Sequence, residues 1–170
     1  MRNGLVCAIA VLAFALPGTV RAQAITAFKA RDLARRHVDA NYQYSLIAAE
    51  GRRSDVSRQP VSWVFWYYDP TAVKEGRRVT VNGSAVTDAR DGYTQLERGR
   101  VVSFQPDEVI PHAKLKIDSD EALGRVMSQG AVKTYRATAS WFRLTLDKEL
   151  KAAVWEVRVW GVVEGETVTV

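Results

Sequence analysis

Histidine and cysteine, the side chains that most often act as bases, nucleophiles or transition-metal ligands, are scarce in this sequence. Only 2 histidines occur among the 170 residues, His37 and His112, and they lie in different halves of the chain. The adjacent acids Asp120 and Glu121 point apart on regular structure, so they cannot face one substrate bond together. The sequence contains no zinc-protease, serine-hydrolase, phosphate-loop or calcium-loop motif. We therefore predict a non-enzymatic protein without catalytic residues, metal ligands or a cofactor.

The two histidines are expected to have structural roles. His37 falls on the apolar side of a predicted helix, together with Leu33, and we interpret it as a core or boundary residue. His112 lies between Pro111 and Ala113, in a segment of turn-forming residues, and we interpret it as a solvated linker residue.

The strand predicted over Val61–Tyr68 is apolar or aromatic on both faces. Side chains alternate along a strand, so one face carries Trp63, Phe65 and Tyr67, and the other carries Val64, Trp66 and Tyr68. A single helix can cover only the first of these faces. The second face either packs against the later, similar half of the chain or a second copy of the protein, or it forms an exposed aromatic binding surface. Its three residues are the candidate binding residues, because Trp and Tyr are frequent at binding hot spots.

Two sequence landmarks recur at one spacing. Ile25 and Ile117 are 92 residues apart, and so are Trp63 and Trp155, by subtraction of their positions. In each half a helix-like stretch begins near the isoleucine, and a later strand contains the tryptophan. Self-similarity at a fixed spacing is typical of duplicated units. The sequence therefore predicts two tandem helix-plus-sheet units.

The first unit is predicted over residues 23–104. Apolar residues at helical spacing predict a helix over 26–41. Strands are expected over residues 42–49, 61–68, 77–81 and 99–104. The dipeptide Asn82-Gly83 predicts a tight hairpin turn. The segment 105–112, which contains two prolines, is the expected linker between the units.

The second unit is predicted over residues 113–170. Asp118 followed by Glu121 resembles a capping box, which marks a helix start. Strands are expected over residues 134–147, 152–161 and 166–170. Along the middle strand, apolar residues alternate with Glu156 and Arg158, which predicts one buried and one solvated face, as in an antiparallel sheet.

Residues 1–22 have the pattern of a cleaved signal peptide. Arg2 supplies the positive start, the apolar stretch 5–16 is too short to span a membrane, and Pro17-Gly18 interrupts it. The only cysteine, Cys7, lies inside the apolar stretch and not at a lipoprotein cleavage point, so the mature protein would have no disulfide. We expect a periplasmic or secreted protein without a membrane span.

The net charge is modest once this segment is removed. Loss of Arg2 and Arg21 lowers the formal charge from +5 to +3. The arginines of the first half are interpreted as a solvated helix face and strand ends. We therefore expect no nucleic-acid partner.

A helix followed by three antiparallel strands, present twice in an exported chain, resembles the PepSY family. The likeness lies in Ile117–Leu123 as the helix opening, Val154–Val157 as the central strand and Gly165–Val168 as the closing strand. The Asp- and Gly-containing turn that usually follows in that family is absent before Val170. The resemblance implies an extracytoplasmic, non-enzymatic module that binds or restrains proteases or other envelope proteins.

The sequence thus predicts an α+β fold of two tandem helix-plus-antiparallel-sheet units packed into one compact body. The expected function is binding of a protein or peptide, with protease inhibition as one form of it, or self-association into a homo-oligomer. Two alternatives remain: a single cystatin-like or NTF2-like domain with a pocket for a small apolar ligand, and a structural envelope protein. A continuous sheet around several helices would favour the first alternative, and two similar halves would favour the tandem units.

Overall fold

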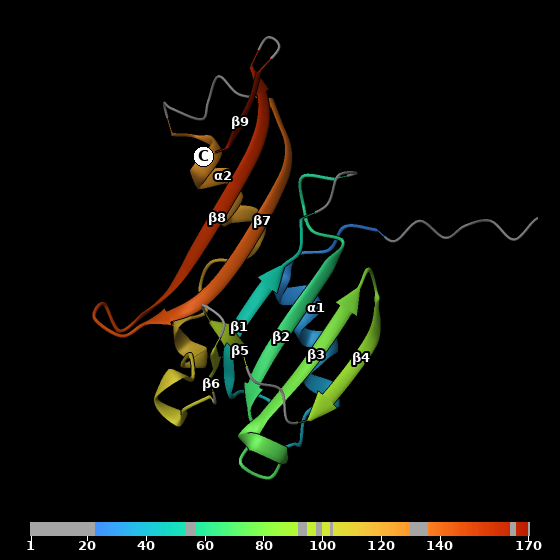
Figure 1. Cartoon of the computed structure of the whole chain (residues 1–170), viewed down its shortest axis with the longest axis vertical. Coiled ribbons are helices and arrows are strands. Elements are labelled where there is room, and N and C mark those ends of the chain that lie inside the picture. The colour runs from blue at the N-terminus through green and yellow to red at the C-terminus, as the bar shows by residue number, and fades with distance from the viewer. Residues whose placement is uncertain are drawn as a thin grey trace, which may run out of the picture.

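The fold is of the mixed α+β class that the sequence predicts. The computed structural model describes residues 23–53, 57–91, 95–97, 100–102, 104–129, 136–163 and 166–169. In these ranges the main body is a seven-stranded sheet with the order β4-β3-β2-β1-β7-β8-β9, and every neighbouring pair is antiparallel. A separate pair, β5-β6, lies near one end of β1 (Figure 1).

The first half of the chain supplies α1 and four strands of the main sheet. These are α1 (Ala27–Ala34), β1 (Leu46–Gly51), β2 (Ser62–Tyr68), β3 (Gly76–Asn82) and β4 (Ala85–Asp91). A 3-10 turn, η2 (Val73–Glu75), precedes β3. The predicted turn at Asn82-Gly83 is confirmed, because Gly83 has a φ of 57° between β3 and β4, a conformation that glycine adopts without steric cost.

The first helix ends earlier than the sequence pattern predicts. A 3-10 turn, η1 (Arg35–His37), follows α1. Val38 then adopts an extended conformation, with φ −112° and ψ 147°, and is buried in the core. Because the backbone leaves the helix here to insert Val38, the side chain of His37 is exposed and does not belong to an apolar helix face.

The middle of the chain contains only short elements. They are β5 (Gln95–Glu97), β6 (Arg100–Val102), η3 (Pro106–Glu108) and η4 (His112–Lys114), the last two being 3-10 turns. The expected linker, residues 105–112, therefore has local structure. Its Ile110 is fully buried, and the Ile110 amide donates a hydrogen bond of 2.7 Å to the carbonyl of Leu46.

The second half supplies α2 and the remaining three strands. They are α2 (Ser119–Met127), β7 (Arg136–Asp147), β8 (Ala152–Val163) and β9 (Glu166–Thr169). Asp118 caps α2 through a side-chain hydrogen bond of 2.7 Å from the Ser119 amide. Glu121 does not complete the predicted capping box, and its carboxylate instead accepts from Arg125 at 2.7 Å.

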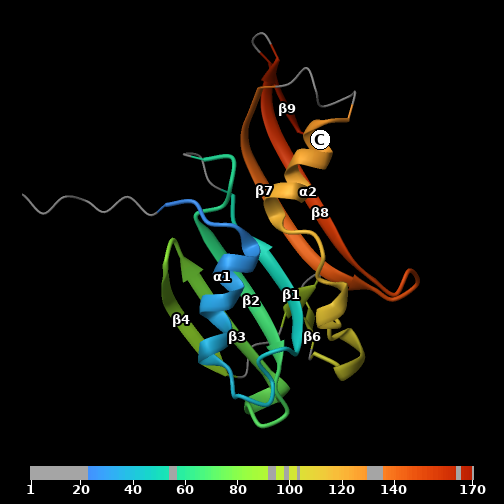
Figure 2. The same ribbon diagram turned by 180° about the vertical axis from the view of Figure 1, so that it is seen from behind.

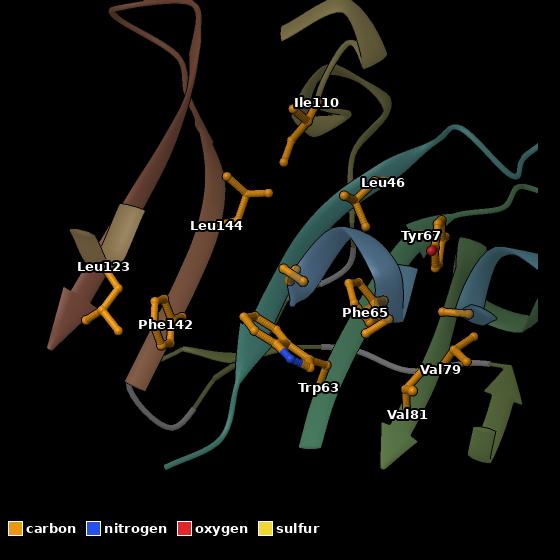
Figure 3. Packing of buried hydrophobic residues seen from close by; sticks show 14 of the residues in the cluster. Leu46, Trp63, Phe65, Tyr67, Val79, Val81, Ile110, Leu123, Phe142 and Leu144 are labelled. Atoms are coloured by element: carbon orange, nitrogen blue, oxygen red, sulfur yellow. The ribbon is translucent and has the colours of Figure 1, made fainter. Parts of the chain in front are cut away.

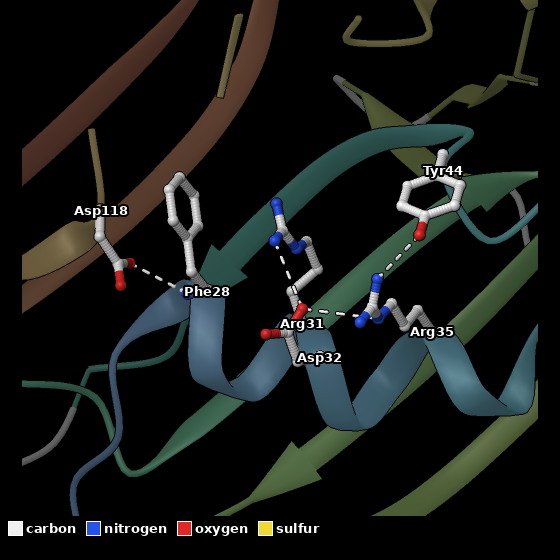
Figure 4. Close-up of polar contacts among 6 residues, drawn as sticks. All are labelled: Phe28, Arg31, Asp32, Arg35, Tyr44 and Asp118. Carbon is white, nitrogen blue, oxygen red and sulfur yellow. Dashed lines mark hydrogen bonds and ion pairs between the residues drawn. The ribbon is translucent and has the colours of Figure 1, made fainter. Parts of the chain in front are cut away.

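The two halves meet through β1 and β7, which pair in the centre of the sheet. Both helices lie on the same face of the sheet, α1 over the strands of the first half and α2 over β7 and β8 (Figure 2). The starts of the two helices are joined. The amides of Ala27 and Phe28 donate hydrogen bonds of 3.0 Å to the side chains of Ser119 and Asp118, respectively. Figure 4 shows the bond between Phe28 and Asp118. These acceptors satisfy amides in the first turn of α1 that have no partner inside the helix.

The main hydrophobic core fills the space between the helices and the sheet (Figure 3). Its centre is an aromatic cluster of Trp63, Phe142 and Trp155, with ring centroids 5.7–6.2 Å apart. Trp63 is fully buried, whereas Trp155 is half-buried. Gly51 makes room for the indole ring of Trp63, because a Cβ atom at position 51 would lie 2.8 Å from Trp63 Cη2. As predicted, Val157 also packs against this core.

Candidate functional site

The candidate binding residues on β2 lie on the face opposite the helices, but that face is covered. Val64 is 2% exposed, Trp66 is 6% exposed and Tyr68 is half-buried. They form a second hydrophobic cluster with Phe104 and Val109. The expectation of an exposed aromatic surface is therefore wrong for Val64 and Trp66, because the segment that follows β6 folds back over them.

Among the described residues, no such apolar cluster covers the corresponding face of β7 and β8. Its outward side chains alternate with the core residues along the two strands. We call five of them the open face, namely Trp141, Arg143, Glu156, Arg158 and Trp160. Glu156 and Arg158 retain 48% and 56% of their side-chain exposure. Both tryptophans are half-buried.

Each tryptophan of the open face is contacted by an arginine. The guanidinium of Arg158 lies 4.8 Å from the ring centroid of Trp141, and that of Arg53 lies 4.8 Å from the centroid of Trp160. Arg158 also donates two hydrogen bonds, of 2.9 and 2.7 Å, to Glu156 Oε1. Cation–π contacts of this type fix both the ring and the guanidinium. The open face is therefore an ordered surface of flat apolar rings and charged groups.

A polar hollow of about 330 Å³ adjoins the open face. Arg143 and Glu156 contribute to its wall from the sheet, and Glu108 and Lys148 from η3 and the β7-β8 turn. Lys148 donates a hydrogen bond of 2.8 Å to Asp107 and thereby links the linker to this turn. That hydrogen bond holds the pKa of Asp107 below its usual value and raises the pKa of Lys148.

Sequence reasoning missed the two tryptophans of this surface. Trp141 and Trp160 both lie in segments predicted as strands, and Arg158 was predicted to point outward. The available signal was the alternation along β8, which places Trp160 on the same solvent-facing side as Glu156 and Arg158. The contact of Arg53 with Trp160 joins residues far apart in sequence. No sequence pattern indicates it.

The two histidines are not brought together. Both are exposed, and the ring of His112 packs edge-on against Tyr44 with centroids 5.2 Å apart. Within the described ranges, no group of three or more His, Cys, Asp or Glu residues is arranged to hold a metal ion. Among those same residues, no helix has the length and apolar character needed to cross a membrane.

Arg31 of α1 and Arg35 at the start of η1 are engaged with neighbouring residues (Figure 4). Arg31 lies over the ring of Phe28 at 4.7 Å and forms an ion pair of 3.3 Å with Asp32. Arg35 donates a hydrogen bond of 3.2 Å to the hydroxyl of Tyr44 and lies 3.5 Å from Asp32. These contacts explain how a basic helix is accommodated beside the core.

Beneath α1, the hydroxyl of Tyr67 is buried. Burial raises the Tyr67 pKa, and the nearby charges of Arg31 and Arg35 oppose that increase. The phenol is therefore neutral at physiological pH, and it belongs to the main core with the helix residues above it.

A comparison with known protein families, with curated proteins and with solved structures finds no match for this chain. The likeness to PepSY domains thus stays a prediction from the sequence.

Proposed function

We propose that this chain is an exported, non-enzymatic module that binds a protein or peptide partner across the open face of β7 and β8. The observation that carries the proposal is the pair Trp141 and Trp160, each in contact with an arginine guanidinium on a face that the linker leaves uncovered. Trp and Arg dominate the energetics of protein interfaces, because they combine a large contact area with polar groups. The adjoining polar hollow offers charged groups for the main chain or polar side chains of an extended segment.

We further propose that the chain consists of two tandem PepSY-like units, residues 23–104 and 113–170. Matched hydrogen bonds support this organisation. The indole of Trp63 donates to the carbonyl of Ile25 at 2.8 Å, and the indole of Trp155 donates to the carbonyl of Ile117 at 2.9 Å, each across 38 residues. Two unrelated halves would have no physical reason to repeat this contact at one spacing.

The pairing of β1 with β7 gives independent support for a duplication. Glu50 pairs with Arg143, and Gly51 pairs with Phe142. A shift of 92 residues, the separation of Ala27 and Ser119 at the starts of the helices, converts position 50 to 142 and 51 to 143. The shift therefore exchanges the two pairs, which is the behaviour expected of two equivalent units related by a two-fold axis.

The export component of the proposal rests on the signal-peptide pattern of residues 1–22. Mass spectrometry of exported material is expected to find a mature N-terminus at Gln23 or Ile25. Exported protein that retains Met1 would contradict the proposed processing.

Selection of displayed peptides against the purified exported protein tests the binding proposal. We expect enriched peptides whose affinity falls at least about tenfold for the double variant Trp141→Ala/Trp160→Ala, as for loss of a hot spot. Tyr44→Ala is the matched control, because Tyr44 is a 55% exposed aromatic residue that also lies under an arginine, beside α1. Binding that survives the double variant, or that is lost equally in Tyr44→Ala, would contradict the open face as the binding surface.

A further inference from the structure

The helix-bearing side of the molecule contains a second hollow, which the proposed binding face does not use. Its volume is about 360 Å³, and it lies between the segment that precedes α2 and the ends of β7 and β8. Leu115 and Ile117 form one wall, and Leu144, Ala153 and Trp155 form the sheet side. This volume lies within the range of small-molecule sites and at its lower end.

The sheet side of this hollow is apolar in character. The one polar atom of the Trp155 side chain, Nε1, donates its hydrogen to the Ile117 carbonyl at 2.9 Å. The indole therefore offers only carbon atoms to a ligand. Leu144 and Ala153 belong to the main core cluster and extend the same apolar surface. A hydrocarbon chain placed against this side would lose contact with water and would cover mainly carbon atoms.

The rim of the hollow carries charge of one sign. The charged residues that line it are Lys114, Lys116 and Lys151, and all three are exposed. The ammonium group of Lys114 donates a hydrogen bond to the carbonyl of Lys151, which ties the segment before α2 to the β7-β8 turn. No acidic residue lines this hollow among the described residues. Lysine ammonium groups act as point charges for anions.

From this combination we infer that the hollow binds a small anionic amphiphile, a carboxylate on a medium-length hydrocarbon chain. The chain lies against Leu144, Ala153 and Trp155, and the carboxylate contacts Lys116 and Lys151 at the rim. The volume suits a single short chain and excludes a whole two-chain lipid. The site is distinct from the open face, because Trp155 and Arg158 alternate onto opposite faces of β8.

Isothermal titration calorimetry with decanoate, below the concentration at which it aggregates, tests this inference on the purified exported protein. We expect saturable binding of one decanoate per chain and at least about tenfold weaker binding for Lys116→Glu and for Lys151→Glu, because each places a negative charge beside the carboxylate. Lys74→Glu is the matched control, since Lys74 is an exposed lysine in the η2 turn before β3. It should leave the affinity unchanged within about twofold.

Three further binding experiments identify what occupies the hollow. The inference predicts that decyltrimethylammonium, with the same chain and opposite charge, does not bind, and that Trp141→Ala leaves decanoate binding intact. Equal affinity for the cationic amphiphile, or decanoate binding that both charge reversals leave unchanged, would overturn it. Binding to phosphatidylglycerol vesicles without any binding of free decanoate would also overturn it, in favour of a membrane-surface contact.

Discussion

The outer faces of β2 and β8 occupy matching positions in the sheet but differ in their burial. The first residues of the two helices, Ala27 and Ser119, are 92 residues apart. The same separation pairs Val64 with Glu156, Trp66 with Arg158, and Tyr68 with Trp160. On β2 the first two positions are buried under Phe104 and Val109. On β8 they are charged and exposed.

This difference shows how the composition of a strand face decides whether that face is buried or stays exposed. An apolar face exposed to water costs free energy in proportion to its area, so it is stabilised by any segment of the chain that can cover it. Phe104, which directly precedes the linker, and Val109 within the linker pack on the face of β2. The face of β8 gains nothing from such a cover, because burial of Glu156 and Arg158 would require their desolvation. Among the described residues it therefore stays without such a cover.

The largest expected effect is on the free energy of unfolding, and it differs between the two central tryptophans, Trp63 and Trp155. Trp63→Ala should lower the free energy of unfolding by roughly 3–5 kcal/mol, the usual cost of removing a fully buried Trp. Trp155→Ala should cost less, because Trp155 is half-buried and one edge of its ring lines a hollow. Chemical denaturation of both variants measures the difference. Equal costs would mean that the two halves of the core are packed equally tightly, contrary to the structure.

The cover over β2 should be the next most sensitive feature. Phe104→Ala is expected to cost about 3 kcal/mol, because it leaves a cavity above Val64 and Trp66. It should also increase binding of a hydrophobic dye. Trp141→Ala on the open face should change the free energy of unfolding by less than about 1 kcal/mol. A neutral Phe104→Ala variant would show that Phe104 does not hold this face closed.

The helix starts provide a smaller contrast. Asp118→Ala should cost about 1–2 kcal/mol, because its carboxylate accepts hydrogen bonds from the amides of Ser119 and Phe28. Thr26, the matching position before α1, makes no side-chain cap hydrogen bond, and its hydroxyl is buried without a partner among the described residues. Thr26→Val should therefore be neutral or slightly stabilising. Thermal unfolding that ranks the two variants in the opposite order would refute the asymmetry of the caps.

The smallest expected effect concerns the exposed ion pair of Lys148 and Asp107, which links the linker to the β7-β8 turn. The pKa of Asp107 is lowered from 3.8, so its contribution to stability is present above that value and is lost as the pH falls through the folded-state pKa. The pKa of Lys148 is raised from 10.5, so its contribution is present below that value and is lost as the pH rises through the folded-state pKa.

Asp107→Asn should accordingly have a slightly lower unfolding midpoint than the unsubstituted protein at neutral pH and low salt. The difference should vanish in strong acid and shrink in high salt, because the pair is exposed and screened. A difference that persists unchanged in acid would assign it to another interaction.

Much of the fold could be predicted from local pattern. The helix start at Asp118, the turn at Gly83 and the alternation along β8 each depend on neighbouring residues, so the sequence contains their signal directly. The end of α1 could not be read in this way. It ends because Val38 is needed in the core, and this requirement comes from tertiary packing.

The candidate site was predicted less well, for a related reason. The pattern of β2 indicated that something must cover Val64 and Trp66, but the expected cover, the second unit or a second copy of the protein, is not the one found. The cover comes from Phe104 and Val109, which lie far along the chain. The contact of Arg53 with Trp160 on the open face is equally distant in sequence. Burial patterns identify a need for packing, and only the structure identifies the segment that meets it.

The rate of thiol labelling at matched positions tests the central claim, that the linker closes the face of β2 and leaves that of β8 open. In a Cys7→Ser background, which contains no other cysteine, Val64→Cys and Glu156→Cys each place one thiol at an equivalent position of the two faces. We predict that Glu156→Cys reacts with a maleimide as fast as an unfolded control. Val64→Cys should react at least about a hundredfold more slowly, because its labelling requires local opening. Similar rates at the two positions would contradict the account.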